Sequence, residues 1–190
     1  DSPAVIPLSS VAGLVNTYTT NIQIRPNMAS DAQGNYVVVW QSFEQDGENY
    51  GIYGQRYSAS GEKTGAEFRV NTNTTRNQTR CAVAMDADGD FVVVWQSRDQ
   101  DGSGDGIYAQ RFNTITTVGI EFRVNTETNE SQVNPSVATD TDGNFVVVWQ
   151  SISQDGSGDG IFAQRFNTTT TVGTEFRVNT FTSNDQSNPS

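Results

Sequence analysis

Residues 91–97 read FVVVWQS, and almost the same seven residues stand at 145–151 (FVVVWQS) and at 36–42 (YVVVWQS). The three tryptophans, Trp40, Trp95 and Trp149, are 55 and 54 residues apart. A repeat of this length is typical of one supersecondary unit that buries its core against its neighbours. The chain is therefore predicted to be a short tandem array.

The repeat extends well beyond the tryptophan strand, since residues 91–126 and 145–180 differ at only five positions. Alignment on the tryptophans divides the chain into three repeats and two partial ones. The predicted parts are the tail of an incomplete preceding repeat at 1–17, repeats at 18–72, 73–126 and 127–180, and the start of an incomplete following repeat at 181–190.

The partial repeats lead to a prediction about assembly. Val15, Asn16 and Thr17 match residues 70–72 in their distance to the next tryptophan, and Asn188, Pro189 and Ser190 match residues 134–136. Two explanations fit: the chain is part of a longer protein, or copies assemble so that the C-terminal segment of one completes the first sheet of the next. These six residues are the predicted assembly residues.

Each repeat contains four segments of β character and none with helical periodicity. The continuous apolar run of residues 91–95 indicates a strand buried on both faces, whereas residues 121–124 alternate as expected near an exposed edge. The Asp- and Gly-rich turn at 86–90 indicates a tight hairpin before the tryptophan strand. The predicted fold is all-β, with tandem four-stranded antiparallel repeats resembling β-propeller blades. A linear stack of small sheets is the alternative.

The predicted strands fall at matching positions in each repeat. The first strands are expected at 28–30, 83–85 and 137–139, the third at 51–57, 106–112 and 160–166, and the fourth at 67–70, 121–124 and 175–178.

The charge and composition of the chain limit the classes of partner that it can bind. The chain has 11 basic and 22 acidic residues, for a net charge of −11. Such a surface repels phosphate backbones and anionic lipid, so we expect no binding to nucleic acid or to a membrane surface. No apolar run is long enough to span a bilayer, so we also expect no membrane insertion. Cys81 stands 14 residues before its tryptophan, as Pro26 and Pro135 do. We therefore interpret it as a small residue in a proline position.

Two acidic loops are candidate calcium ligands. Alternating Asp, Ser and Gly can wrap oxygen atoms around a hard cation such as Ca²⁺. The candidates are Asp101, Ser103, Asp105, Asp155, Ser157 and Asp159. In the first repeat Tyr50 replaces the second aspartate. A solvated hairpin loop without metal is the alternative, because the same residue types favour turns.

Two other recurring groups have structural explanations. Asp86, Asp88 and Asp90 resemble the start of an EF-hand loop, but Ser97 stands where that motif requires glutamate, which favours a turn. Arg56 and its equivalents could bind a carboxylate ligand through paired N–H groups. They recur together with Glu67 and its equivalents, however, and this favours an ion pair between neighbouring strands.

No catalytic constellation is apparent. The chain has no histidine, and largely the same carboxylates recur from repeat to repeat, whereas one reacting centre needs differently tuned groups. The prediction is that the protein is not an enzyme.

The motifs VVVWQS, DGSGDGIYAQRF and EFRVNT together resemble tandem repeats of large secreted bacterial surface proteins, including cyanobacterial and marine ones. The resemblance covers nearly the whole chain and implies an extracellular repeat module. We therefore expect a structural or adhesive protein whose partner is a second copy or the rest of a longer chain. A multivalent, lectin-like propeller that binds glycans, with or without calcium, is the alternative.

Overall fold

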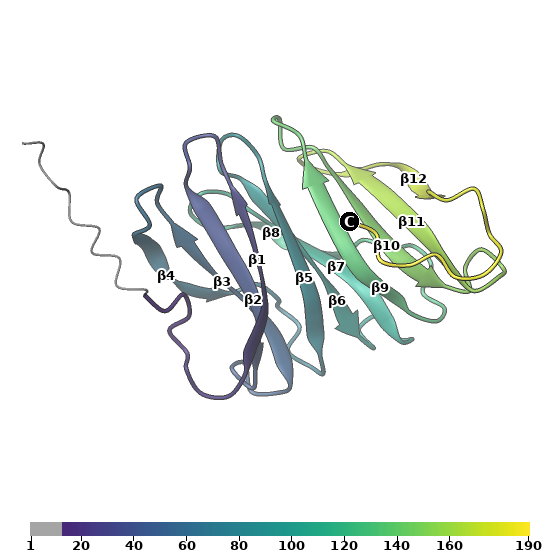
Figure 1. The fold of residues 1–190 in the computed structure, drawn as a ribbon, viewed down its shortest axis with the longest axis horizontal. Helices are drawn as coiled ribbons and strands as arrows, with labels where there is room; N and C mark the ends of the chain where they lie inside the picture. The colour runs from purple at the N-terminus through teal and green to yellow at the C-terminus, as the bar shows by residue number, and fades with distance from the viewer. Residues whose placement is uncertain (1–12) are drawn as a thin grey trace, which may run out of the picture.

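The computed structural model describes residues 13–190, which form twelve β-strands in three sheets and contain no helix (Figure 1). The strands of the first sheet are β1 (Gln23–Ser30), β2 (Tyr36–Phe43), β3 (Tyr50–Tyr57) and β4 (Lys63–Arg69). Those of the second are β5 (Gln78–Met85), β6 (Phe91–Arg98), β7 (Asp105–Phe112) and β8 (Thr117–Arg123). The third contains β9 (Gln132–Thr139), β10 (Phe145–Ile152), β11 (Asp159–Phe166) and β12 (Thr171–Arg177).

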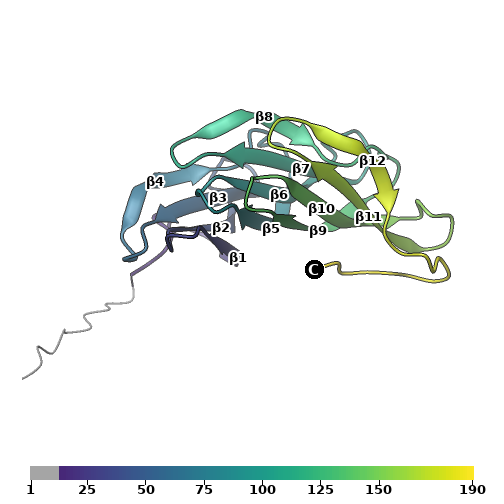
Figure 2. The same cartoon turned by 90° about the horizontal axis from the view of Figure 1, so that it is seen from above.

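Within each sheet the strands follow chain order, and every neighbour is antiparallel. The sheets stand side by side in sequence order (Figure 1). Seen from above, β1, β5 and β9 lie along one side of the molecule, and β4, β8 and β12 form an outer arc on the other (Figure 2). This arrangement confirms the predicted all-β class and the blade-like, four-stranded antiparallel repeats.

The central sheet is buried on both faces, and its tryptophan strand β6 shows this most clearly. Val93 and Trp95 pack into a cluster with the first sheet. Val92 and Val94 point the other way, into a cluster with the third sheet. Since successive residues of a strand face opposite sides, a continuous apolar run is what a strand between two sheets requires.

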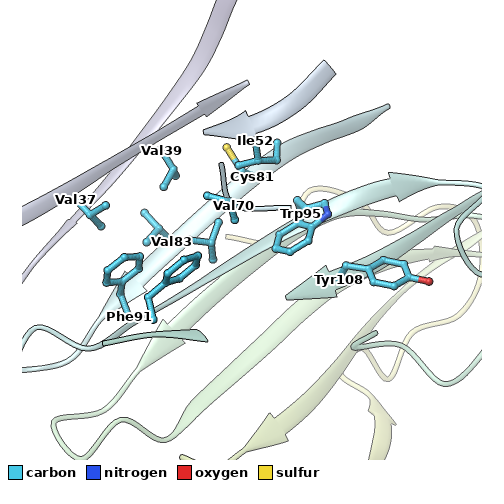
Figure 3. Close-up of a cluster of buried hydrophobic side chains, with 11 residues drawn as sticks. Val37, Val39, Ile52, Val70, Cys81, Val83, Phe91, Trp95 and Tyr108 are labelled. Atoms are coloured by element: carbon cyan, nitrogen blue, oxygen red, sulfur yellow. The ribbon is translucent and has the colours of Figure 1, made fainter. Parts of the chain in front are cut away.

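The cluster between the first two sheets shows how the sheets hold together (Figure 3). Val37, Val39 and Ile52 come from the first sheet, while Trp95 and Tyr108 come from the second. All five side chains are buried. Burial of apolar area between sheets, at roughly 25 cal/mol per Å², is therefore a main source of their mutual stabilisation.

The predicted hairpin before each tryptophan strand is confirmed. Asp86 Oδ1 accepts hydrogen bonds from the backbone N–H groups of Asp88 (3.0 Å) and Asp90 (2.9 Å). Gly89 supplies the positive φ, 92°, that the turn needs. The acidic residues thus stabilise a turn, as the failed EF-hand pattern predicted.

Two strand boundaries differ from the predictions. The first strands begin about five residues earlier than predicted, before the proline position, because a bulge lets the chain continue through it. The bulge in β1 lies between Ile24 and Asn27. The fourth strands also begin earlier, at Lys63 in the first repeat.

Candidate functional site

The recurring arginine of β3 holds neighbouring sheets together. The Arg56 guanidinium carbon lies 4.4 Å from the ring centroid of Phe68 in its own sheet. It also lies 5.1 Å from the ring of Phe91 and 5.8 Å from that of Phe112, both in the second sheet. Its Nη2 donates a 3.3 Å hydrogen bond to the carbonyl of Asn113. We call an arginine with these three rings and this carbonyl an arginine cage.

The second and third sheets form the same cage. The Arg111 guanidinium lies 4.6 Å, 5.0 Å and 5.9 Å from the rings of Phe122, Phe145 and Phe166. Its Nη2 donates to the carbonyl of Asn167, at 3.3 Å. Burial lowers the pKa of Arg111, as it does for its equivalent in the first cage. Cation–π contacts thus take the place of a carboxylate partner.

The predicted ion pair between Arg56 and Glu67 is therefore wrong. Glu67 Oε2 instead accepts hydrogen bonds from the backbone N–H (2.5 Å) and the hydroxyl (2.9 Å) of Thr17, and its Oε1 accepts one from Gln45. The equivalent glutamates of the other sheets do the same with residues Thr72 and Thr126. The glutamate fixes the segment that leads into its own sheet.

A glutamine of each tryptophan strand binds the next repeat. Gln41 Oε1 accepts a 2.7 Å hydrogen bond from the backbone N–H of Arg80. Gln96 accepts in the same way from Asn134, and Gln150 from Asn188, each at 3.4 Å. The first and second sheets therefore position the bulge residue of the following innermost strand, and the third sheet binds the equivalent residue of the C-terminal segment.

The outward face of the third sheet has half of an arginine cage. Arg165 has only the ring of Phe176 within cation–π range among the described residues, at 5.9 Å. Val178 is 50% exposed on this face, whereas its equivalent Val124 is 3% exposed. Phe176 is also 40% exposed. These side chains are the ones that a following sheet would cover.

The outward face of the first sheet has the complementary half. The rings of Tyr36 and Tyr57 stack at 4.8 Å with an interplanar angle of 7°. They stand where Phe91 and Phe112, also stacked, receive Arg56. This face also leaves Met28 60% exposed, although the equivalent valine in the second sheet is 7% exposed.

The N-terminal assembly residues are bound to the first sheet. The carbonyl of Val15 accepts a hydrogen bond from the Tyr57 hydroxyl, at 3.2 Å. Asn16 Nδ2 donates to the carbonyl of Tyr18 and to the side chain of Gln23. Thr17 is held by a glutamate, as described above. The first sheet already has four strands from its own repeat.

The C-terminal assembly residues lie against the third sheet. Asn188 binds the tryptophan strand through its backbone, and Pro189 and Ser190 line a cavity with the innermost strands. Just before them, the backbone N–H of Gln186 donates to the carbonyl of Asp159, at 2.9 Å. The segment thus lies where the innermost strand of a following sheet would begin.

In the second repeat, the candidate calcium ligands have other partners. Asp101 receives a weak bond from the Ser103 N–H (3.4 Å), and its carboxylate lies directly against Gly106. Asp105 Oδ2 lies 3.2 Å from Arg98 Nη1.

The third repeat is similar. Asp155 accepts from the Ser157 N–H (3.2 Å), and the Asp159 carboxylate accepts from Gln150. Residues 13–190 contain no group of three or more acidic, histidine or cysteine side chains placed to hold a metal ion. Calcium binding stays a prediction.

Cys81 is buried between the first two sheets, and burial raises the pKa of its thiol to about 12. A thiol that stays protonated at neutral pH packs as a small apolar group, as its proline position predicted.

Among the described residues there is no helix long and apolar enough to cross a membrane.

The three four-stranded sheets follow one another in chain order, and the central sheet is buried on both faces. These features define a repeat protein of tandem sheets that resemble β-propeller blades. No family model matches the chain, and no curated protein matches it in sequence. A solved structure that it resembles is the endo-arabinase from Bacteroides thetaiotaomicron, with a TM-score of 0.47 and 17% identity. The match covers 78% of this chain and 61% of that one, so this chain spans about three fifths of its length.

Proposed function

We propose that this protein is a non-enzymatic, extracellular structural or adhesive module that self-assembles by stacking the third sheet of one copy on the first sheet of the next. The half-cage of Arg165 carries the proposal. Both cages within the chain join an arginine to a stacked aromatic pair of the following sheet, and the outward face of the first sheet offers such a pair. The extracellular location rests on the resemblance of the repeats to secreted bacterial proteins.

The apolar side chains of the two faces support the same pairing. Val178 occupies the position of Val70 and Val124, which are buried between sheets. Met28 occupies the position of Val83, which packs against the first sheet. A contact between different faces of two copies forms a ring if the rotation closes and a filament if it does not.

Two terminal segments must move in this assembly. Residues 15–17 occupy, on the first sheet, the place that Val178 and the next two residues of the other copy would take, since Thr17 is bound to Glu67 as Thr72 is bound to Glu121. The C-terminal segment 181–190 occupies the place of an innermost strand on the third sheet, where the β1 strand of the second copy has to lie. β1 is paired along β2, whereas the segment 181–190 contains no strand. We therefore infer that β1 stays with its sheet and that the C-terminal segment is displaced.

Analytical ultracentrifugation across a range of concentrations tests the proposal. The unmodified chain should gain mass with concentration, and Val178→Asp and Arg165→Ala should each weaken the association at least tenfold. Ile120→Asp is the matched control, because Ile120 is 84% exposed in β8, away from both faces. A chain that stays monomeric at millimolar concentration, or equal losses in the control, would contradict stacking.

Removal of residues 181–190 distinguishes the two forms of assembly. If β1 displaces the segment, the shortened chain should associate more tightly than the full chain. If instead the segment completes the first sheet of the next copy, as the sequence predicted, its removal should weaken association.

Glycan binding is the second candidate, and a cavity between the first two sheets favours it. The cavity measures about 210 Å³ and is lined by aromatic, guanidinium, carboxylate and amide groups, which together suit a sugar ring. Its lining includes Asp31, Asn35 and Arg56 of the first sheet and Met85 and Phe91 of the second. A glycan array read with and without calcium tests this function, and no binding in either condition would exclude it.

A further inference from the structure

Four equivalent tripeptides line one cavity at the inner side of the sheets. The cavity measures about 310 Å³, and each sheet contributes one tripeptide from its innermost strand. The fourth comes from the C-terminal segment. The tripeptides are Arg25-Pro26-Asn27, Arg80-Cys81-Ala82, Asn134-Pro135-Ser136 and Asn188-Pro189-Ser190. We call this space the axial cavity, since the innermost strands β1, β5 and β9 run together there (Figure 2).

The backbone fixes the first residue of each tripeptide. Arg25, Arg80, Asn134 and Asn188 all have positive φ, between 53° and 56°. Arginine rarely adopts this conformation, so the surrounding structure must hold it there. In the last three tripeptides a tryptophan-strand glutamine of the preceding sheet binds the backbone N–H of that residue. The fold therefore fixes the backbone conformation of the residues that line the cavity.

The charge of the lining is opposite to that of the protein. The chain has a net charge of −11, yet none of the twelve lining residues is acidic and two are arginines. Arg25 and Arg80 form no ion pair with any residue between 13 and 190, where the paired arginines are Arg76 and Arg98. Arg25 and Arg80, both of them exposed side chains, therefore line the cavity without a carboxylate to neutralise them.

The remaining polar groups are hydrogen-bonding amides and hydroxyls. Asn27, Ser136 and Ser190 add neutral donors to the lining. Asn134 Nδ2 is already bound to Gln150, at 2.9 Å. Guanidinium groups recognise planar carboxylates and tetrahedral sulfates through paired N–H donors. This chemistry suits a small oxyanion and disfavours a metal cation.

We propose that the axial cavity binds a small oxyanion, a sulfate or carboxylate group, between Arg25 and Arg80. The group is either a free ion or the charged substituent of an acidic sugar. The proposal applies to the single chain with segment 181–190 in place, because stacking of copies would displace Asn188-Pro189-Ser190 from the cavity.

Isothermal titration calorimetry with sodium sulfate and with sodium glucuronate, at constant ionic strength, tests the proposal. The unmodified chain should bind at least one of the two anions at a single site. The double variant Arg25→Gln/Arg80→Gln should lower that affinity at least tenfold. Sulfate binding alone identifies a free ion, and preferred glucuronate binding identifies an acidic sugar; either outcome supports the site.

The matched control is Arg123→Gln/Arg177→Gln, which removes the same charge from the outer strands β8 and β12 and leaves the cavity intact. Arg80→Lys sharpens the test, because lysine keeps the charge but loses the paired donors, and it should bind with intermediate affinity. Circular dichroism verifies that each variant is folded. No binding of either anion, or an equal loss in the control, overturns the proposal.

Discussion

The second and third sheets have nearly the same sequence and very different surroundings. Residues 91–126 and 145–180 differ at five positions, yet Val124 is buried and Val178 is half exposed. Arg111 has a complete cage, and Arg165 contacts one ring. The difference comes from the neighbour, because among residues 13–190 the second sheet alone has another sheet against both faces. In this array a residue's contribution to stability depends on which sheet follows it.

Replacement of the equivalent valines by aspartate should give the largest difference in stability between the second and third sheets. Val124→Asp buries a charge between two sheets and should lower the free energy of unfolding by about 3 kcal/mol or more. Val178→Asp should lower it by less than about 1 kcal/mol, since half of the side chain is exposed. Urea unfolding of both variants measures the difference. Equal losses would show that the two faces are equally covered.

Replacement of an equivalent glycine by alanine should instead lower the stability of the two sheets equally, because the glycine contacts an aspartate of its own sheet. A Cβ atom added at Gly106 would lie 2.5 Å from Asp101 Oδ2, and one at Gly160 would lie 2.9 Å from Asp155 Oδ2. Alanine at either position should therefore cost about 1–3 kcal/mol. Adding Asp101→Ala to Gly106→Ala should recover part of the loss in thermal unfolding. A much smaller loss in one sheet would mean that this contact also depends on the neighbouring sheet.

The arginine cage should contribute less than the valine core but show the same asymmetry. Arg111→Ala removes cation–π contacts with three rings and one hydrogen bond between sheets, a loss of about 1–2 kcal/mol. Arg165→Ala should cost below about 0.5 kcal/mol in the isolated chain. Denaturant unfolding at low protein concentration compares them, because stacking of copies would stabilise the unmodified chain.

The smallest effect concerns the hairpin before β6. Burial and nearby Asp86 raise the pKa of Asp90, whereas Asn144, its equivalent in the third sheet, donates to Asp140 (2.8 Å). A raised folded-state pKa means that stability falls as pH rises through that pKa. Because Asp90 is exposed and solvent screens its charge, Asp90→Asn should stabilise the chain by less than about 0.5 kcal/mol at pH 7. Thermal unfolding should show the gain vanishing below the unfolded-state pKa, about 3.9. A gain that persists there would rule out charge as its source.

The sequence predicts much of the fold because its strongest signals are local. The apolar run at Trp95 and the Asp–Gly turn at 86–90 each specify a structure within a few residues. The bulge in the innermost strands was missed, because a proline position suggests a strand boundary while the ladder in fact shifts register around it.

The contacts of the site residues were harder to predict. Each residue type recurs in every repeat, so the sequence does not show which repeat supplies the residue that a given side chain contacts. Every repeat contains an arginine, a glutamate and phenylalanines, so co-occurrence alone suggested that Arg56 pairs with Glu67. The rings of Phe91 and Phe112 belong to the next repeat, about 35 and 56 residues further on, and only the stacking of sheets brings them to Arg56. The axial cavity likewise gathers residues from three repeats and from the partial repeat at 181–190.

The glutamine contacts give the array a direction. Gln41, Gln96 and Gln150 each bind a residue 38 or 39 positions later in the chain. During synthesis, an earlier sheet is therefore complete, with its glutamine in place, before the strand that it binds has left the ribosome. Domains generally fold from the N-terminus as they emerge. We expect each finished sheet to act as a template for the next, so that the array grows one sheet at a time in the order of translation.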